Sequence, residues 1–283
     1  MKFDKNTKIL IVGLGLIGGS YAKALSDEGY FVGAIDKKKS SVEYALKNGL
    51  IQVGETSVKK DFVKDFDLIV FALYPHDFIN WIKEYQSSIK SGALITDVTG
   101  VKSFVVENVQ KILRGDLEFV GAHPMAGKEV SGVENADPKI FVGANYIVTP
   151  TKRNTDENVQ AVQDLGRALG FERVSSLSPE EHDETVGFLS HLTHCIAVSL
   201  MVSKKSHHLA EYTGDSFRDL TRIAKINDEM WSELFLANKD ELLKQMDLFE
   251  EKFNQLKEDI KNDNREKIRE TLRESTARRK VFD

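Results

Sequence analysis

Cysteine is nearly absent from this chain of 283 residues, because Cys195 is its single cysteine. One cysteine excludes an intramolecular disulfide framework of the kind that small secreted proteins depend on. The chain also lacks a basic excess, since 39 lysines and arginines stand against 44 aspartates and glutamates, a net charge of -5. Nucleic acids and anionic membranes require a basic surface, so we expect neither kind of partner.

Long hydrophobic runs are also missing from the sequence. The first residues, MKFDKNTKIL, contain no apolar segment long enough for a signal peptide, and no run approaches the roughly 20 apolar residues that span a bilayer. We therefore expect a soluble, cytoplasmic protein. Its length is sufficient for two ordinary domains, each with its own core.

Short apolar runs alternate with helical segments through residues 1–175. Segments with helical spacing, such as SVEYALKNG and SVKKDFVKD, separate runs that resemble buried strands. This alternation predicts parallel βαβ units and an α/β domain with a Rossmann-type, doubly wound sheet. The predicted strands are KILIV, FVGAI, DLIVFAL, ALITDV, LEFVGAH and NYIVTP.

Residues 176–283 lack such strands and predict an all-α domain. Its first helix has a clear start, because Ser178 suits the N-cap, Pro179 the first helical position and Glu181 the reciprocal position of a capping box. We place the domain boundary near residue 175. Further along, apolar residues with the spacing 4-3-4-3-4 indicate either a coiled-coil seam or a helix packed on its own domain: Leu242, Met246, Phe249, Phe253, Leu256 and Ile260.

A glycine-rich loop lies between the first predicted strand and helix. Residues 13–18, GLGLIG, match the GxGxxG pattern of dinucleotide-binding domains. Gly13 permits a tight turn, Gly15 lets the backbone approach a pyrophosphate, and Gly18 allows the helix to pack closely on the strand. Leu16 and Ile17 begin the helix, whose N-terminal amides favour phosphate.

Asp36 ends the next predicted strand, 18 residues beyond the last glycine of the loop. A carboxylate at this position accepts hydrogen bonds from a ribose diol and repels a 2'-phosphate, which favours NAD over NADP. Lys37, Lys38 and Lys39 leave NADP possible, because lysines here could hold that phosphate, although a solvated helix start explains them equally simply.

Ligands of doubly wound sheets bind outside the carboxyl ends of the strands. Three segments follow strands here, YPHDF (74–78), DVTGVK (97–102) and AHPMAGKE (122–129), so we expect all three to face the cofactor. His76 fits an exposed loop histidine. His123 ends a predicted strand before a proline and a turn without bulk, so it is a candidate reagent as well as a candidate packing residue.

The helical half supplies further polar groups. FLSHLTH places His191 and His194 three residues apart on an otherwise apolar helix face. No cysteine or carboxylate at ligand spacing completes a metal set, so we expect no metal and keep hydrogen-bonded core histidines as the alternative. FRDLTRIAKINDEMW carries Arg222 and Trp231 in a stretch that also fits a solvated, salt-bridged helix.

These motifs together resemble the prephenate dehydrogenase family, in order and along nearly the whole chain. The most specific are HPMAGKE and the TRIA stretch nine residues before WSELF. The resemblance implies a Rossmann-type domain, a helical dimerisation domain and a homodimer. It also implies NAD-dependent oxidative decarboxylation of prephenate to 4-hydroxyphenylpyruvate on the route to tyrosine. The matching segments are GLGLIGGS, TDVTGVK, HPMAGKEVSGVENA, SHLTH and FRDLTRIAKINDEMW.

The resemblance also implies roles for individual residues. The family's catalytic histidine falls on His123, and the partner acid of the same motif falls on Glu129. His194 falls on the histidine tied to substrate binding, Arg222 on the arginine that binds a substrate carboxylate, and Trp231 on the tryptophan nine residues later. His123 would take the proton of the substrate hydroxyl as hydride leaves for the nicotinamide, a contribution of about 10² to 10⁴ in rate.

One position departs from the family pattern. Many members have a serine where this chain has Gly100, so the hydroxyl that assists the catalytic histidine or the substrate is absent there. Thr99 and Ser103 are the hydroxyls available to replace it, and we predict that Thr99 binds substrate.

Three other functions remain open on sequence grounds. An arogenate dehydrogenase acts on the analogue with an ammonium in place of the keto group. A hydroxyacid dehydrogenase would share the glycine loop and the helical domain but lack the HPMAGKE and TRIA motifs. A dinucleotide sensor without catalysis is favoured by Gly100 alone. The dicarboxylate substrate of the leading hypothesis requires local cations in a chain of net negative charge, and Arg222 is the candidate.

Overall fold

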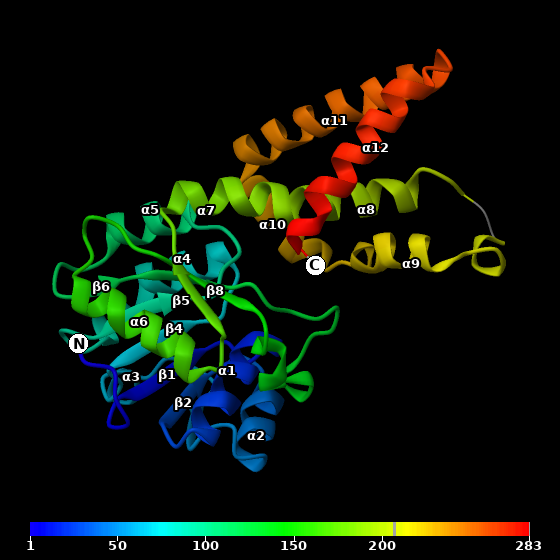
Figure 1. Cartoon of the computed structure of the whole chain (residues 1–283). Helices are drawn as coiled ribbons and strands as arrows, with labels where there is room; N and C mark the ends of the chain where they lie inside the picture. Colours follow the sequence, from blue (N-terminus) through cyan, green and yellow to red (C-terminus); the bar gives the residue numbers. More distant parts are fainter. Residues whose placement is uncertain (206–207, 283) are drawn as a thin grey trace.

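The computed structural model describes residues 1–205 and 208–282, which form an α/β part and a helical part (Figure 1). The α/β part contains a six-stranded sheet in the order β3-β2-β1-β4-β5-β6, with every neighbouring pair parallel. This order is that of dinucleotide-binding doubly wound folds and confirms the predicted fold class. The strands are β1 (Lys8–Val12), β2 (Phe31–Ile35), β3 (Val53–Glu55), β4 (Leu68–Phe71), β5 (Leu94–Asp97) and β6 (Glu118–Phe119).

Both faces of this sheet are covered, as the continuous apolar strands require. In β1, Ile9 and Ile11 belong to one core cluster, while Leu10 and Val12 belong to the other, because successive side chains of a strand point to opposite faces. The first cluster includes side chains of α1, α2 and α6, and the second those of α3, α4 and α5. These helices are α1 (Leu16–Asp27), α2 (Lys39–Lys47), α3 (Lys60–Val63), α4 (Pro75–Tyr85), α5 (Ser103–Ile112) and α6 (Asp156–Ala168).

A second sheet corrects the prediction of one strand over LEFVGAH. The run is divided after Phe119, and β7 (Gly121–Pro124) pairs antiparallel with β8 (Asn145–Thr149), which pairs parallel with β9 (Arg173–Ser176). A Cβ on Gly121 would lie 2.5 Å from the Thr149 hydroxyl, so glycine permits this close approach. A continuous apolar run does not reveal where a strand changes partners, which is why the sequence suggested one sheet.

The helical part begins as predicted. The Ser178 hydroxyl accepts a hydrogen bond from the Glu181 amide at 3.1 Å, and the Glu181 carboxylate accepts one from the Ser178 amide at 2.8 Å, so the capping box is confirmed. Helix α7 (Pro179–Val186) continues through a π-helical turn (Gly187–Leu192) into α8 (Thr193–Val202).

By length and composition, one helix among the described residues could cross a membrane. It is Pro179–Val202, with a mean hydropathy of 1.5 and 28% of its most apolar window buried. The expectation that no such segment exists was wrong, because serine, threonine and histidine interrupt the apolar residues and hide the trend. The same helix buries His182, Asp183 and His191, so its first half packs against the rest of the protein, while Met201 and Val202 near its end are exposed.

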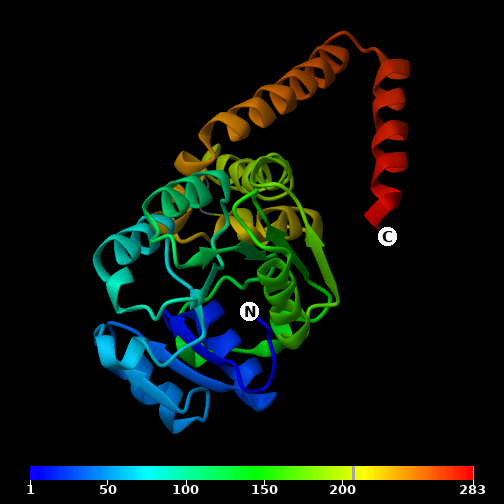
Figure 2. The same cartoon turned by 90° about the vertical axis from the view of Figure 1, so that its left-hand side faces the viewer.

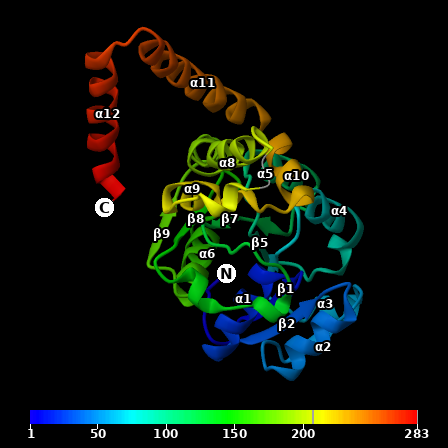
Figure 3. The ribbon, with the colours of Figure 1, turned by 90° about the vertical axis from the view of Figure 1, so that its right-hand side faces the viewer.

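The remaining helices form a bundle and an arm. Helix α10 lies beside α4 and α5 (Figure 3), and the Glu233 carboxylate accepts a hydrogen bond from the His76 amide at 2.7 Å. Helices α11 and α12 make an arm that projects from the body (Figures 1 and 2). These helices are α9 (Asp215–Thr221), α10 (Asp228–Ala237), α11 (Lys239–Lys261) and α12 (Arg265–Arg279).

Candidate active site

The glycine loop is shaped by backbone contacts that leave no room for side chains at two positions. Gly13 has φ +100°, and a Cβ there would lie 2.4 Å from the Ala72 carbonyl oxygen. A Cβ on Gly18 would lie 1.9 Å from the Gly13 carbonyl oxygen. At Gly15, by contrast, no atom of the described chain lies within 4 Å of an added Cβ. The backbone at Gly15 is therefore open to a bound group.

The start of α1 and the end of β2 complete this corner of the fold. Gly15 is the N-cap of α1, so the amides of Leu16 and Ile17 in the first turn have no side-chain cap and are suited to an anion. The Asp36 carboxylate accepts hydrogen bonds from the backbone amides of Leu14 and Lys38, each at 2.7 Å. Both contacts hold it beside the loop with lone pairs remaining for ribose hydroxyls. These residues fit a dinucleotide.

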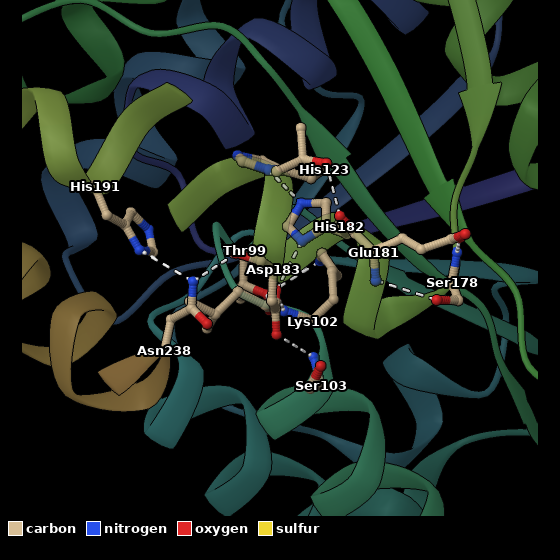
Figure 4. A network of polar contacts seen from close by, with 12 residues as sticks. Thr99, Lys102, Ser103, His123, Ser178, Glu181, His182, Asp183, His191 and Asn238 are labelled. Atoms are coloured by element: carbon tan, nitrogen blue, oxygen red, sulfur yellow. Dashed lines mark hydrogen bonds and ion pairs between the residues drawn. The ribbon is translucent and has the colours of Figure 1, made fainter. Parts of the chain in front are cut away.

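His123 is partly buried on β7 and makes its ring contact with another histidine. Its Nδ1 lies 2.9 Å from Nε2 of His182, whose own Nδ1 lies 2.8 Å from the Asp183 carboxylate (Figure 4). A carboxylate only accepts, so His182 donates from Nδ1 and accepts at Nε2. This network therefore assigns the proton of His123 to Nδ1 and leaves Nε2 as a free lone pair.

Asp183 is held firmly by the start of helix α5. Its two carboxylate oxygens accept hydrogen bonds from the backbone amides of Lys102 at 2.8 Å and Ser103 at 2.7 Å. The N-terminus of a helix stabilises a negative charge, so Asp183 is both anchored and favoured as an anion. From sequence, SPEEHDETV indicated only a helix start, so His182 and Asp183 were not predicted as site residues. The adjacency of a histidine and an aspartate was the one signal in the sequence that pointed to them.

Burial determines the protonation of the histidine chain. It lowers the pKa of His123 well below the usual value, and the neighbouring His182 and Lys102 lower it further. Burial also lowers the pKa of His182, although the hydrogen bond to Asp183 opposes this. For Asp183, burial alone raises the pKa, but the hydrogen bonds from His182 and the backbone outweigh it and lower the pKa. At neutral pH the imidazoles of His123 and His182 are therefore both neutral, and the hydrogen-bonded series ends on the ionised carboxylate of Asp183.

A buried ion pair supports the loop of residues 97–102, which lies next to these two histidines. The ammonium of Lys102 lies 2.7 Å from the Asp97 carboxylate and 3.1 Å from the Thr99 hydroxyl. Thr99 in turn donates its hydroxyl hydrogen bond to Asp97 or to the Val101 carbonyl. The Thr99 side chain is thus directed into the protein, and it supports the loop in place of the predicted substrate contact.

Gly100 lies at the free face of the His123 ring. A Cβ at this position would be 3.8 Å from Nε2 of His123 and 3.5 Å from two methyl groups of Leu234, all ordinary contacts. A serine here would place its hydroxyl next to Nε2. With glycine, that side of the ring is clear, and the polar contact of the ring comes from His182 on its other side.

Glu129 and Arg222 pair with each other across the two parts of the chain. The Arg222 guanidinium forms an ion pair with the Glu129 carboxylate, with the two side chains 66% and 37% exposed. The predicted pairing of Glu129 with His123 is therefore replaced by a pairing with the predicted carboxylate clamp. An arginine this exposed remains accessible to a carboxylate from solution.

His194 and Trp231 lie against each other, with ring centroids 3.7 Å apart. The Ser190 carbonyl accepts a hydrogen bond from Nδ1 of His194 at 2.8 Å, which leaves Nε2 free. Burial lowers the pKa of His194, while the Glu129 charge raises it and the Arg222 charge lowers it again. Three of the four residues that the sequence assigned to substrate, His194, Arg222 and Trp231, are thus brought near one another, and Thr99 is not among them.

His191 lies beside His194 and Trp231 and has a structural role. It lies 3.3 Å from the amide nitrogen of Asn238, which donates to the Asp183 carbonyl at 2.9 Å. His191 and His194 both pack on Trp231, so the predicted shared face is present.

The fold and the site together define a dinucleotide-binding oxidoreductase with a neutral imidazole whose Nε2 is unprotonated and an arginine contributed by a helical second domain. Two family models cover the chain: the nucleotide-binding domain of prephenate dehydrogenase matches residues 21–173, and its dimerization domain matches residues 178–274. The chain belongs to the prephenate dehydrogenase family.

Relatives agree with this assignment. The prephenate dehydrogenase of Bacillus subtilis is 34% identical over 84% of this chain, and the match covers 66% of the B. subtilis protein, just under two thirds of its length. The cyclohexadienyl dehydrogenase of Zymomonas mobilis is 29% identical, with 96% of this chain and 94% of that protein covered. The structure of prephenate dehydrogenase from A. aeolicus, in complex with hydroxyphenyl propionate and NAD+, has a TM-score of 0.89 at 34% identity and covers 98% of each chain.

Proposed function

We propose that this protein is an NAD-dependent prephenate dehydrogenase that converts prephenate to 4-hydroxyphenylpyruvate by oxidative decarboxylation. The observation that carries the proposal is the free Nε2 of His123, supported by a hydrogen-bonded chain and located in a fold that matches a solved prephenate dehydrogenase over 98% of its length. A neutral imidazole with a free lone pair is the group that this reaction needs at the substrate hydroxyl.

His123 acts as the general base. The proton of the substrate hydroxyl passes to Nε2 while hydride leaves the same carbon, and loss of carbon dioxide then makes the ring aromatic. The bound nicotinamide supplies the hydride acceptor. The lowered pKa of His123 keeps the base neutral and available at physiological pH.

Arg222 binds a substrate carboxylate, as its exposed guanidinium permits. In the structure Glu129 pairs with this guanidinium, so an incoming carboxylate replaces the carboxylate of Glu129. His194 and Trp231 form the adjacent surface for the rest of the substrate. Glu129 thereby holds Arg222 in position before substrate arrives, a role different from the predicted contact with the catalytic histidine.

NAD is held by Gly13, Gly15 and Gly18 together with Asp36. The open backbone at Gly15 and the uncapped start of α1, with Leu16 and Ile17, receive the pyrophosphate. Asp36 receives the ribose diol, and its carboxylate disfavours a 2'-phosphate.

We also propose a homodimer formed through the helical part. The C-terminal half matches a dimerization domain, and the seam on α11 is largely exposed, with Met246 and Phe249 each 39%, Phe253 59% and Ile260 58% exposed, while Leu242 is buried. Exposed apolar residues at coiled-coil spacing are suited to a second copy of the same helix.

The test is turnover of purified protein with NAD or NADP against prephenate and arogenate, following reduced cofactor and carbon dioxide together. We expect both products from prephenate with NAD. Preference for arogenate would assign the amino-acid analogue as substrate. Reduced cofactor without carbon dioxide would contradict decarboxylation, and no turnover with either compound would favour a non-catalytic dinucleotide sensor.

A further inference from the structure

We propose that His182 and Asp183 are positioning residues that fix the tautomer and orientation of His123, the role that a hydroxyl at position 100 would otherwise share. This inference rests on the proposed function for its catalytic consequence. Its structural content, the location of one proton on the His123 ring, is independent of the substrate.

The direction of the hydrogen bonds from His123 to His182 and Asp183 follows from the carboxylate at which they end. Asp183 accepts backbone amides from Lys102 and Ser103, and it accepts Nδ1–H of His182 at 2.8 Å. Each of these contacts requires an acceptor, so the carboxylate fixes His182 with Nε2 unprotonated. His123 must then donate from Nδ1 across the 2.9 Å contact. The anchor is rigid because α5 and α7 belong to different parts of the fold and meet at this carboxylate (Figure 4).

The free nitrogen faces the side that glycine keeps open. Nε2 of His123 lies 3.8 Å from the position that a Cβ on Gly100 would occupy, and the other atoms near that position are methyl groups of Leu234, which offer no hydrogen bond. A side-chain hydroxyl that could orient the ring from this face is missing at position 100. The His123 ring is therefore oriented by His182, which contacts its Nδ1.

The same chain stabilises the charge that the reaction creates. When the O–H bond of the substrate breaks, the proton forms an N–H bond at Nε2, and His123 becomes an imidazolium. Its Nδ1–H points at His182, and the negative charge at the end of the chain is Asp183. The other charged or titratable groups facing the pair are Lys102, whose ammonium is paired with Asp97, and His191 from the neighbouring helical turn.

Asp183→Ala is the sharpest test because it removes the acceptor that fixes the direction of the hydrogen bonds. Without the carboxylate, nothing holds the proton of His182 on Nδ1, so the contact between His182 and His123 can run in either direction and Nε2 of His123 is protonated in part of the molecules. We expect kcat to fall at least about tenfold, because the base is partly blocked and the imidazolium loses its counter-charge, with KM for prephenate and NAD affinity changed less than about threefold.

The readout specific to this role is ¹⁵N NMR of histidine-labelled protein, with the His123 signals assigned from a His123→Asn variant. The wild type should show a protonated Nδ1 and an unprotonated Nε2, and in Asp183→Ala both nitrogens should shift towards intermediate values. His191→Gln is the control: it removes a buried histidine of the same helix that bonds to Asn238, and it should leave the His123 tautomer unchanged.

A second pair of variants tests the chain without Asp183. Glutamine at position 182 offers a carbonyl that accepts Nδ1–H of His123, while leucine offers no acceptor. We expect His182→Gln to retain at least about tenfold more kcat than His182→Leu. Equal kcat values, or an unchanged His123 tautomer in Asp183→Ala, would overturn the inference.

The two proposals fail differently. If the wild type does not turn over prephenate but the tautomers of His123 become mixed in Asp183→Ala, the proposed function is wrong and the hydrogen-bonded chain is supported. If the wild type is active and the tautomer is insensitive to Asp183, the function stands and this inference falls. If Asp183→Ala does not fold by circular dichroism, the tautomer of His123 in the wild type and the two His182 variants decide.

Discussion

The surroundings of His123 determine its pKa and therefore the pH range in which it can act as a base. His123 is partly buried, and burial lowers its pKa well below the ordinary histidine value of about 6.5. A general base must be neutral, so a lowered pKa widens the pH range in which it works. The group that loses activity on protonation should therefore titrate below the ordinary value.

We expect kcat/KM for prephenate to remain constant as the pH falls through about 6.5 and to decline only as it passes the lowered pKa of His123. Activity is present above that pKa and lost below it. The measurement is a pH profile of kcat/KM, restricted to pH values where circular dichroism shows the native fold. An acid limb at or above the ordinary histidine pKa would contradict the assignment of His123 as the base.

The pH profile must be limited to the folded protein because acid also lowers the stability of the fold. His123 and His182 both have lowered pKa values in the folded state, while the unfolded chain protonates its histidines near the ordinary value of about 6.5. Below that pH the unfolded state binds more protons, so the free energy of unfolding falls with decreasing pH. Loss of fold and loss of the base must therefore be measured separately.

One continuous helical element carries most of the polar residues of the site. From Pro179 to Val202 it presents Asp183 to α5, His182 to His123, and His194 to Trp231. The π-helical turn lies between the first pair and His194. The start of this helix matters because Asp183 lies little more than one turn beyond its N-cap, where a frayed end would move it.

Ser178→Ala removes the hydroxyl that caps this helix. We expect the free energy of unfolding to fall by about 1 kcal/mol, the usual cost of losing an N-cap side chain, and kcat to fall together with it as Asp183 loses rigidity. Urea denaturation and steady-state kinetics measure the two effects. Ser178→Thr keeps an acceptor and should restore both values. An unchanged denaturation midpoint in the alanine variant would show that the capping box contributes little.

At the scale of the whole molecule, the arm of α11 and α12 contacts the body mainly at the start of α11, which packs on α7 and the π-helical turn. Beyond that contact the arm projects from the body (Figure 2). Apolar residues along most of the seam are exposed. Surfaces of this kind are normally covered in the native assembly.

Phe253→Glu places a charge at the centre of the seam. We expect the dimer to dissociate or weaken at least about tenfold, because a carboxylate buried without a partner is costly. Light scattering after size exclusion measures the mass. Asn254→Glu, which adds the same charge at an exposed position beside the seam on the same helix, is the matched control and should remain dimeric. A wild type that is monomeric at micromolar concentration would refute the proposed dimer.

Much of the fold was predictable because its signals are local. The alternation of apolar runs and amphipathic segments indicated the parallel sheet, and the Ser178 capping box indicated the start of the helical part. The glycine loop could be interpreted because each glycine answers a short-range constraint, such as the 1.9 Å contact that a Cβ on Gly18 would make with Gly13. The division of LEFVGAH between two sheets was not predictable, because strand pairing is a long-range choice.

By itself the sequence determined the fold class, the family and the positions of the imidazole and the guanidinium, since these depend on residue type and spacing. Only the tertiary structure decided that His123 contacts His182, that Glu129 contacts Arg222, and that the Thr99 hydroxyl turns inward. Such contacts join residues 59 and 93 positions apart. A hydrogen bond has a direction and a length of about 3 Å, and no spacing along the chain specifies either until the helices and sheets have packed.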